Sequence, residues 1–288
     1  MEKPRSAAGY PPEGGEHARA ACLYVATVLG DLLVEELVVV VGGLVPSLLI
    51  TQDPLPEGVP LHPGTMDLDL GLSLGVLDGA KYHEIAERLR QAGFEAKQNA
   101  AGNTMLQTWT IRGNQGQEVT IDFLIGPASE ADRPAGIKHL ESDFGAVITP
   151  GLNLAFRDKE IVPMDGITVM GERAKRDIPV CGPGAFVILK ALAFDSRGAP
   201  KDAYDLYYTI RNFSRGAEEV ADRIIGLLPD TEGEKALGIL GRDFTSADLV
   251  GPLRAAEFIG DTDQDVIRQD VVGFVNALLV RVDQRAGD

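Results

Sequence analysis

The chain has 288 residues, of which 44% are hydrophobic and 24% are charged, so it is long enough to bury the core of one large domain or of two lobes. Its formal net charge of −16 at pH 7 argues against broad, sequence-independent binding to nucleic acid or to an anionic membrane, because both require a basic surface. The two cysteines, Cys22 and Cys181, fit no metal-binding spacing, which favours a reduced, cytoplasmic protein.

The first forty residues predict a coil segment, a helix and a buried strand. Residues 1–15 have turn and coil composition without an apolar period, so we expect a disordered leader. Residues 16–36 carry apolar side chains at helical spacing, and residues 38–41 are a β-branched run typical of a buried strand. Charged residues interrupt this apolar region, and no basic n-region or cleavage site is present. We therefore expect neither a signal peptide nor a membrane span.

An alternating segment follows the glycine pair that ends this strand. Gly42 and Gly43 are followed by a predicted short helix, and residues 66–74 then alternate, which predicts a strand with Asp67 and Asp69 on one face. The two Cα atoms would be about 7 Å apart. At that separation both carboxylates can bind one hard cation. A half-buried strand with a solvated polar face explains the same pattern.

The next segment predicts a helix and a β-hairpin. Residues 79–92 form a helix that ends at Gly93, and strands over 105–111 and 118–125 are joined by a polar, glycine-containing turn. The second strand contains Asp122. An Asp within an apolar strand is disfavoured unless another group binds it, and a hydrogen bond to a neighbouring loop is the alternative explanation.

The second half of the chain predicts short strands and then helices. Residues 129–144 are expected to be irregular with a short helix. Strands are expected at 146–148, 152–156, 160–162 and 167–170, and helices at 184–195, 201–213, 217–228, 235–240, 247–258 and 263–282. Between residues 155 and 215, ten Lys and Arg stand against eight Asp and Glu, so this region is where an anionic substrate would be tolerated.

Together these features match the layout of a nucleotidyl transfer site. Glycines let the backbone approach a triphosphate and present N–H groups to it. Two carboxylates can hold Mg²⁺ (or Mn²⁺), and a third, Asp122, can share a second metal and accept the proton of an attacking hydroxyl. Each part also has a structural explanation: a tight turn for the glycines, a surface position for Lys190, and an i,i+4 ion pair for Lys201 and Asp205.

Three motifs resemble the AbiEii/AbiGii-type nucleotidyltransferases, a family that includes the MenT-like toxins. They are the run Val38-Val39-Val40-Val41-Gly42-Gly43, the segment Thr65-Met66-Asp67-Leu68-Asp69, and Leu189-Lys190-Ala191-Leu192 followed by Arg197, Lys201-Asp202 and Asp205-Leu206-Tyr207. The resemblance spans about residues 38–213.

The resemblance implies an α/β (α+β) protein with two lobes and an active site between them. We expect a nucleotidyltransferase-fold core domain with a mixed sheet over residues 16–130, connecting strands over 131–180, and a mainly helical C-terminal lobe over 181–288. Family members transfer a nucleotide from an NTP, with Mg²⁺, to an acceptor such as the 3′ end of tRNA. A toxin of this kind would also have a cognate antitoxin.

The motifs imply a role for each matching residue. Asp67 and Asp69 would be the metal ligands, and Gly42, Gly43 and Thr65 would face the triphosphate. Lys190 and Lys201 would neutralise its charge, and Asp202 and Asp205 would orient those lysines or the base. Asp122, which lies outside the motifs, remains the third candidate metal ligand. Two positions depart from the family. Pro63 stands where an Arg is usual, with His62 as the nearest polar residue, and Leu44 stands where other nucleotidyltransferases have Ser.

The sequence therefore predicts a cytoplasmic, Mg²⁺-dependent nucleotidyltransferase that moves an NMP from an NTP to an acceptor hydroxyl. The expected acceptor is the 3′ end of tRNA, and the expected setting is a toxin–antitoxin system without a membrane partner. Two alternatives remain. One is transfer to a small molecule such as an aminoglycoside, and the other is a catalytically impaired module that binds a nucleotide or a partner.

Overall fold

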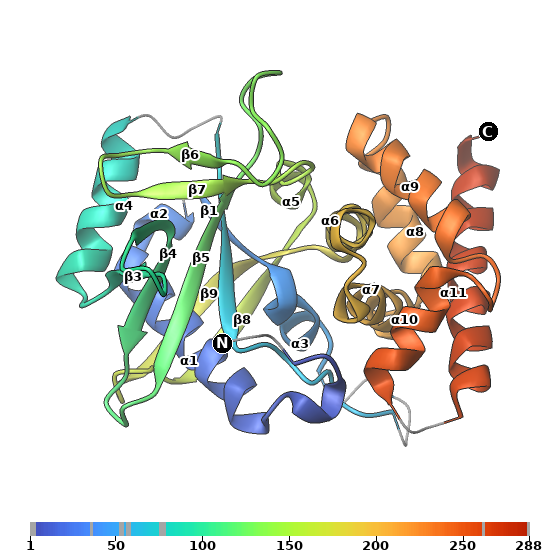
Figure 1. Cartoon of the computed structure of the whole chain (residues 1–288), viewed down its shortest axis with the longest axis horizontal. Coiled ribbons are helices and arrows are strands. Elements are labelled where there is room, and N and C mark those ends of the chain that lie inside the picture. The colour runs from blue at the N-terminus through green and yellow to red at the C-terminus, as the bar shows by residue number, and fades with distance from the viewer. Residues whose placement is uncertain are drawn as a thin grey trace. The chain divides into compact units, whose positions relative to one another are not determined.

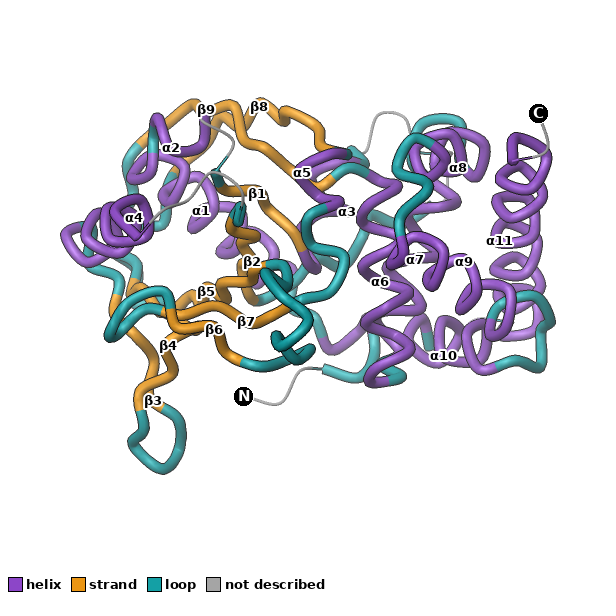
Figure 2. The backbone as a smooth tube through the Cα atoms, turned by 90° about the horizontal axis from the view of Figure 1, so that it is seen from above, coloured by secondary structure: helices purple, strands orange, loops and turns teal. Residues whose placement is uncertain are grey.

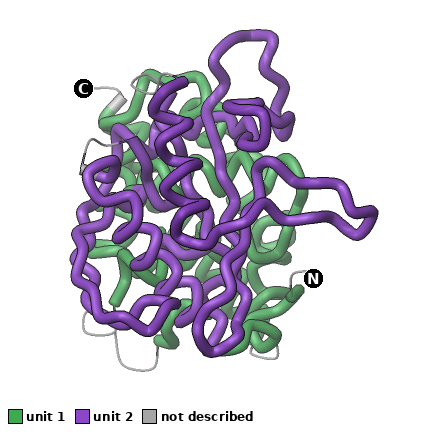
Figure 3. Tube along the Cα trace, turned by 90° about the vertical axis from the view of Figure 1, so that its left-hand side faces the viewer, with its two compact units in different colours: residues 1–11, 46–63, 182–288 green, residues 12–45, 64–181 purple. Residues whose placement is uncertain are grey.

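The computed structural model describes residues 4–34, 37–51, 55, 59–74, 79–260 and 263–286 and divides the chain into two compact units (Figures 1 and 3). Unit 1 comprises Met1–Pro11, Pro46–Pro63 and Gly182–Asp288, and unit 2 comprises Pro12–Val45 and Gly64–Cys181. Both units are therefore assembled from segments that are separate in the sequence.

Unit 2 is built on a mixed sheet, which has nine strands among the described residues, in the order β3-β4-β5-β2-β1-β9-β8 with β7 and β6 branching from β5 (Figure 2). The strands are β1 (Val38–Val41), β2 (Asp67–Leu72), β3 (Glu95–Gln98), β4 (Thr104–Arg112), β5 (Glu118–Ile125), β6 (Ile137–His139), β7 (Gly145–Ile148), β8 (Lys159–Ile167) and β9 (Arg173–Cys181). The helical segments are α1 (Pro12–Leu29), α2 (Asp31–Val34), η2 (Gly42–Leu44), α4 (Gly79–Gln91) and α5 (Leu154–Arg157).

One face of this sheet is the core of unit 2. Alternate residues of β2, β4 and β5 are buried there, among them Leu68, Trp109, Ile121 and Phe123, and α1 and α4 cover them (Figure 1). The Phe144 ring packs edge-to-face against the rings of Phe123 and Trp109, with centroids 5.0 and 5.6 Å away. Burial of alternate apolar side chains fixes which face of each strand remains for polar residues.

Unit 1 is helical. Its helical segments are η1 (Ala7–Gly9), α3 (Val45–Leu49, of which Val45 belongs to unit 2), α6 (Pro183–Arg197), α7 (Pro200–Asn212), α8 (Ala217–Ile225), α9 (Thr231–Asp243), α10 (Val250–Ile259) and α11 (Gln264–Ala286). Helix α6 starts with Pro183 in its first turn and ends at Gly198, whose φ of 59° is the left-handed conformation of a C-terminal glycine. Helices α6 and α7 pack on each other, and most of their residues are buried.

The N-terminal segment differs from the sequence prediction. Disorder was expected over residues 1–15, but the described part contains η1 and the first turn of α1. The reason is aromatic packing, which composition does not reveal: Tyr10 is 8% exposed, and its ring lies 5.8 Å from that of Phe258 in α10. Residues 1–3 lie outside the described residues.

The connecting region also differs. The strand expected at 152–156 is replaced by the helix α5, and β3, β6 and β9 were not predicted. Strand β9 pairs with β8 along its whole length and with β1 in parallel, so this region is part of the main sheet. Hydrophobic alternation does not reveal β9 as a strand, because the first half of β9 is charged.

One unit boundary also differs. Pro46–Pro63, expected in the N-terminal lobe, belongs to unit 1.

The strand expected at 167–170 is a turn after β8, and the segment 129–144 contains β6 but no helix. The remaining predicted elements are present, with ends shifted by a few residues. Among the helices in the described part of the chain, none combines the length and the apolar character needed to cross a membrane.

Replacing Phe144 with Ala tests the packing of a segment that the sequence predicts to be irregular. Because Phe144 is fully buried against two rings, we expect the free energy of unfolding to fall by about 3–5 kcal/mol. The fluorescence of the single tryptophan, Trp109, reports the urea transition directly. Ile161→Ala is the control, since that side chain is in the same unit and 56% exposed. Equal midpoints for the two variants would contradict this packing.

Candidate functional site

Three predicted carboxylates lie on the polar face of the unit 2 sheet. Strands β2 and β5 are parallel neighbours, with Asp69 paired to Asp122 and Asp67 paired to Thr120. Paired residues of neighbouring strands point to the same face, so Asp67, Asp69 and Asp122 share the face opposite to Leu68. Neighbouring strands are about 4.8 Å apart, and alternate residues of one strand are about 7 Å apart. Asp69 and Asp122 are therefore directly opposite each other, and Asp67 lies in the next residue pair on the same face.

Gly42 brings the backbone into contact with one of these carboxylates. Its φ is +70°, and a Cβ built on it would lie 1.8 Å from Oδ2 of Asp69. Any side chain at this position would therefore both clash and adopt an unfavourable backbone conformation. Gly43 follows in η2 and is buried. A group bound by the backbone of this turn would meet the Asp69 carboxylate directly.

Two threonines set the surroundings of the carboxylates. Thr108 of β4 is buried and paired to Asp122, and its hydroxyl donates a 2.6 Å hydrogen bond to Oδ1 of that carboxylate. Thr108 was not among the predicted site residues, because the predicted hairpin gave the two strands but not their register. Thr65, also buried, accepts a 3.4 Å hydrogen bond from the backbone N–H of Asp67 through its hydroxyl. Thr65 therefore shapes the entry to β2.

The carboxylates do not form a complete protein cage for a metal. Among the residues that the structure describes, no group of three or more His, Cys, Asp and Glu side chains is arranged to hold a metal ion. The sheet supplies two neighbouring carboxylates, Asp69 and Asp122, and Asp67 lies in the adjacent residue pair. Such a donor set fits a hard cation that takes its remaining oxygen ligands from phosphate groups and water, as Mg²⁺ usually does.

A second group of predicted residues forms a buried ion network in unit 1. Lys190 of α6 lies 2.7 Å from Oδ2 of Asp205 and 3.1 Å from Oδ1 of Asp202. Lys201 contacts both oxygens of Asp205, at 2.8 and 3.0 Å. Arg197 binds Asp202 through two nitrogens, at 2.6 and 2.8 Å. The network ties the C-terminal half of α6 to the first two turns of α7.

His62 completes this network from a separate segment. Its Nε2 lies 2.8 Å from Oδ1 of Asp205, and both side chains are fully buried. The ring stacks on Tyr204, with centroids 5.4 Å apart, and meets Tyr208 edge-on at 5.1 Å. Tyr208 also donates a hydrogen bond to the carbonyl of Pro60. These contacts hold the end of Pro46–Pro63 on α7, a role that the sequence did not reveal.

Burial and neighbouring charges shift the pKa values in this network. Burial and the positive charge of Lys201 lower the pKa of His62 to about 4, so the ring is neutral at pH 7 and donates its Nε2 proton to Asp205. Burial alone would raise the pKa of Asp205, but Lys190, Lys201 and the His62 hydrogen bond hold it well below its ordinary value. Burial lowers the pKa of Lys201. Burial also acts to lower the pKa of Lys190, but the carboxylates of Asp205 and Asp202 outweigh it and raise that pKa above its ordinary value.

The predicted site residues thus fall into two sets, each close-packed within its own unit. In unit 2 these are Gly42, Gly43, Thr65, Asp67, Asp69 and Asp122, and in unit 1 they are Lys190, Lys201, Asp202 and Asp205.

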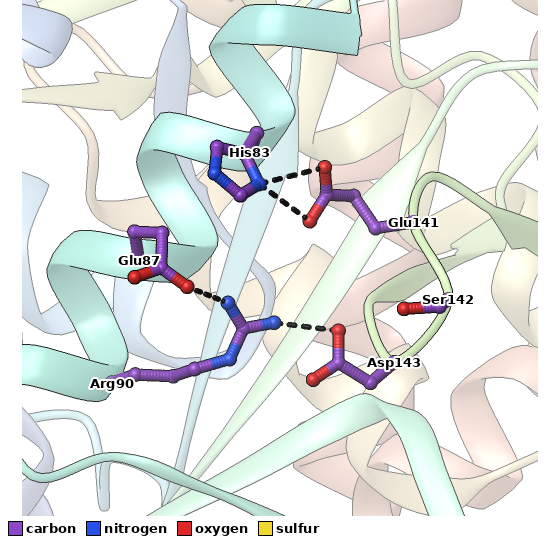
Figure 4. Close-up of a pocket in the computed structure, with 6 residues that line it drawn as sticks. All are labelled: His83, Glu87, Arg90, Glu141, Ser142 and Asp143. Carbon is purple, nitrogen blue, oxygen red and sulfur yellow. Dashed lines mark hydrogen bonds and ion pairs between the residues drawn. The ribbon is translucent and has the colours of Figure 1, made fainter.

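A shallow surface hollow of about 510 Å³ lies elsewhere in unit 2, between α4 and the loop at residues 141–143 (Figure 4). Its charged groups pair with one another: His83 with Glu141, and Arg90 with Glu87 and Asp143. Arg90 also covers the ring of Trp109, which points away from the carboxylate face. The hollow is therefore on the other side of the sheet, and its ion pairs hold the loop on α4.

Comparisons with known proteins add likenesses without establishing a family. No family model and no curated protein matches the sequence. An antigenic nucleotidyltransferase-like protein from Paracoccidioides brasiliensis is similar in structure, with a TM-score of 0.39 and 18% identity over 76% of this chain and 86% of that one. Bradyrhizobium diazoefficiens CD-NTase CdnG, solved in complex with GTP, has a TM-score of 0.28 and 8% identity over 96% of this chain and 100% of that one. At such TM-scores neither similarity supports a conclusion about function, so the proposed function depends on the residues of this chain alone.

Replacing Gly42 with Ala tests the contact with Asp69. The added Cβ would overlap the carboxylate, so we expect the variant to displace Asp69 and to lower the free energy of unfolding by about 1–3 kcal/mol. Thermal unfolding measures the effect. Gly238→Ala in α9, where no atom lies within 4 Å of the added Cβ, should leave stability unchanged or raise it by about 1 kcal/mol. Equal melting temperatures would contradict the contact.

The buried His62 predicts a pH dependence of stability. Its pKa is about 4 in the folded chain and about 6.5 when unfolded, so the unfolded chain binds the additional proton. About 3 kcal/mol of stability is present above pH 6.5 and is lost as the pH falls to 4. Urea unfolding of His62→Gln should show a shallower slope across this range. His83→Gln, at a side chain that is 61% exposed, should keep the wild-type slope. An unchanged slope in His62→Gln would contradict this assignment.

Proposed function

We propose that this chain is a nucleotidyltransferase that transfers an NMP from an NTP to an acceptor hydroxyl. The observation that carries the proposal is the contact between the Gly42 backbone and the Asp69 carboxylate, with Asp122 directly across on the next strand. A glycine turn suits the phosphates of a nucleotide, and adjacent carboxylates suit the cation that accompanies them. In this chain the glycine turn and the carboxylate are in contact. If the turn and the polar strand had unrelated structural roles, no such contact would be required.

The chemistry of the donor set fits a divalent cation bound jointly by protein and phosphate. Asp67, Asp69 and Asp122 would hold it, and the incomplete protein cage agrees with the habit of Mg²⁺ of using one or two carboxylates together with phosphate oxygens. When bound, the cation would offset the negative charge that develops on the transferred phosphoryl group.

The side chains of the protein would perform the remaining tasks. The Thr108 hydrogen bond orients Asp122, and we assign to Asp122 the acceptance of the proton from the attacking hydroxyl at a carboxylate oxygen. Gly42 and Gly43 would approach the phosphates, and Thr65 would position the start of β2 through its contact with Asp67. The hydrogen-bonded, half-buried setting of Asp122 keeps it in one orientation on the rigid sheet.

For Lys190 and Lys201 we propose, within unit 1 itself, a site that favours an anion such as a phosphate. Lys190, Lys201 and Arg197 pair with the carboxylates of Asp202 and Asp205, and His62 is neutral. These six side chains carry one positive charge in excess, which favours an anionic ligand. In this assignment Asp202 and Asp205 orient the lysines, as the family resemblance implies.

The acceptor that we propose is the 3′ end of tRNA, in the setting of a toxin with its antitoxin. The net charge of −16 would equally suit a cationic small molecule such as an aminoglycoside, so both acceptors belong in the same experiment. Growth arrest on expression favours the RNA acceptor, whereas drug resistance favours the small molecule.

Asp69→Asn tests the proposal. Incubation of the wild type with each α-labelled NTP, Mg²⁺ and total tRNA should label the RNA. The variant should lose at least about 100-fold in rate because it lacks one of the carboxylates that would hold the cation. Asp165→Asn is the control, since Asp165 is an exposed carboxylate of β8 paired with Arg173.

The outcomes separate the alternatives. Label on an aminoglycoside instead of RNA would reassign the acceptor. NTP binding without label on either acceptor would identify an impaired nucleotide-binding module. Equal activity of Asp69→Asn and the wild type would overturn the proposed site.

A further inference from the structure

The carboxylate face continues beyond the three aspartates. Asp67 of β2 is paired with Thr120 of β5, Thr120 with Thr110 of β4, and Thr110 with Glu95 of β3. These residues form one row across the sheet on the carboxylate face. The β3–β4 hairpin lies at the end of the sheet (Figure 2). Polar side chains thus extend from the proposed metal ligands to the sheet edge.

Lys97 of β3 reaches back along this face. Its Nζ donates a 3.2 Å hydrogen bond to Oγ1 of Thr120, so the side chain crosses β4 to reach β5. Thr120 is paired to Asp67 and stands two residues before Asp122 on the same strand face. Thr120, to which the ammonium group is bound, is therefore about 4.8 Å from Asp67 and about 7 Å from Asp122 at Cα.

The ammonium group of Lys97 is placed to receive an anion from solution. The side chain is 36% exposed, and Oε1 of Glu118 lies 3.9 Å away, beyond hydrogen-bond distance. An exposed pair at that separation contributes little to stability. Lys97 locally reduces the repulsion that the neighbouring carboxylates exert on a phosphate, and a divalent cation held by those carboxylates would reduce it further.

We propose that Lys97 and Thr120 bind a phosphate of the acceptor, which makes the acceptor a phosphate-bearing nucleic-acid end instead of a polycationic small molecule. This inference rests on the proposed function. It explains how a chain with a net charge of −16 can hold an anionic strand: a local cation is bound to Thr120, two residues before the carboxylate that receives the hydroxyl proton. The alternative is that Lys97 only offsets the negative charge of Glu118 and Asp67.

The experiment compares Lys97→Gln, Lys97→Arg and the control Lys81→Gln. Lys81 is a matched control because its side chain is 34% exposed and lies 3.7 Å from Glu84 on α4. We expect Lys97→Gln to raise the KM for total tRNA about ten-fold at low salt, with kcat and the KM for NTP within about two-fold of wild type. Loss of one phosphate contact should also reduce the dependence of log KM on log salt by about 0.7. Lys97→Arg should restore both, and Lys81→Gln should change neither.

A direct binding measurement makes the inference independent of turnover. Fluorescence anisotropy of a labelled single-stranded RNA hexamer should show about ten-fold weaker binding to Lys97→Gln than to wild type or Lys81→Gln. Binding that is equal for all three proteins, or absent for the wild type, would overturn the inference. A lower melting temperature of Lys97→Gln with unchanged RNA binding would do the same and would assign Lys97 to charge balance.

Failure of the proposed function gives a different result. A wild type that labels no acceptor with any NTP contradicts nucleotidyl transfer, while the hexamer measurement still decides whether Lys97 binds phosphate. A wild type that labels kanamycin, with Lys97→Gln labelling it faster, would support nucleotidyl transfer but overturn the phosphate-bearing acceptor.

Discussion

The candidate site depends on the parallel pairing of β2 with β5. This pairing sets Asp69 beside Asp122, and a shift of one residue in either strand would turn its aspartates to the opposite face. The register is fixed from the other side of the sheet, where Leu68, Ile121 and Phe123 are buried beneath α1 and α4. Hydrophobic burial on one face therefore determines the geometry of charge on the other. The carboxylates need no direct contact with one another to be held in place.

Gly42 links this sheet geometry to ligand chemistry. Strand β1 lies beside β2, with Val41 paired to Asp69, so the chain must turn away next to a carboxylate. The left-handed conformation of Gly42 makes that turn possible without a side chain in the path of Oδ2. The result is a turn whose backbone lies directly against a carboxylate. A bound phosphate would require a cation there, because the carboxylate alone would repel it.

Local sequence patterns predicted the parts of this site but not all of its neighbours. Alternation gave the common face of Asp67 and Asp69, and the hairpin pattern placed Asp122 in a strand. Periodicity does not state which strands pair, so the parallel contact of β2 and β5 could not be derived from it. The burial of His62 was equally hidden. Its partners Asp205, Tyr204 and Tyr208 are more than 140 residues away, and a proline-rich surrounding predicts only a loop.

Whether a lysine can bind a phosphate depends on which groups already pair with it, as the network around Asp205 shows. Lys190 and Lys201 are within hydrogen-bond distance of carboxylates, so a phosphate that approaches them must compete with an Asp205 whose pKa is already held low by these contacts. Removing either cation would leave a buried negative charge poorly paired, which makes these lysines costly to move. Of the three cations in this network, Arg197 is the most exposed, with 61% of its side chain accessible while it pairs with Asp202. On the sheet the corresponding cation is Lys97, which is hydrogen-bonded to the Thr120 hydroxyl and only loosely paired with Glu118 at 3.9 Å, so an anion could engage it at little cost in stability.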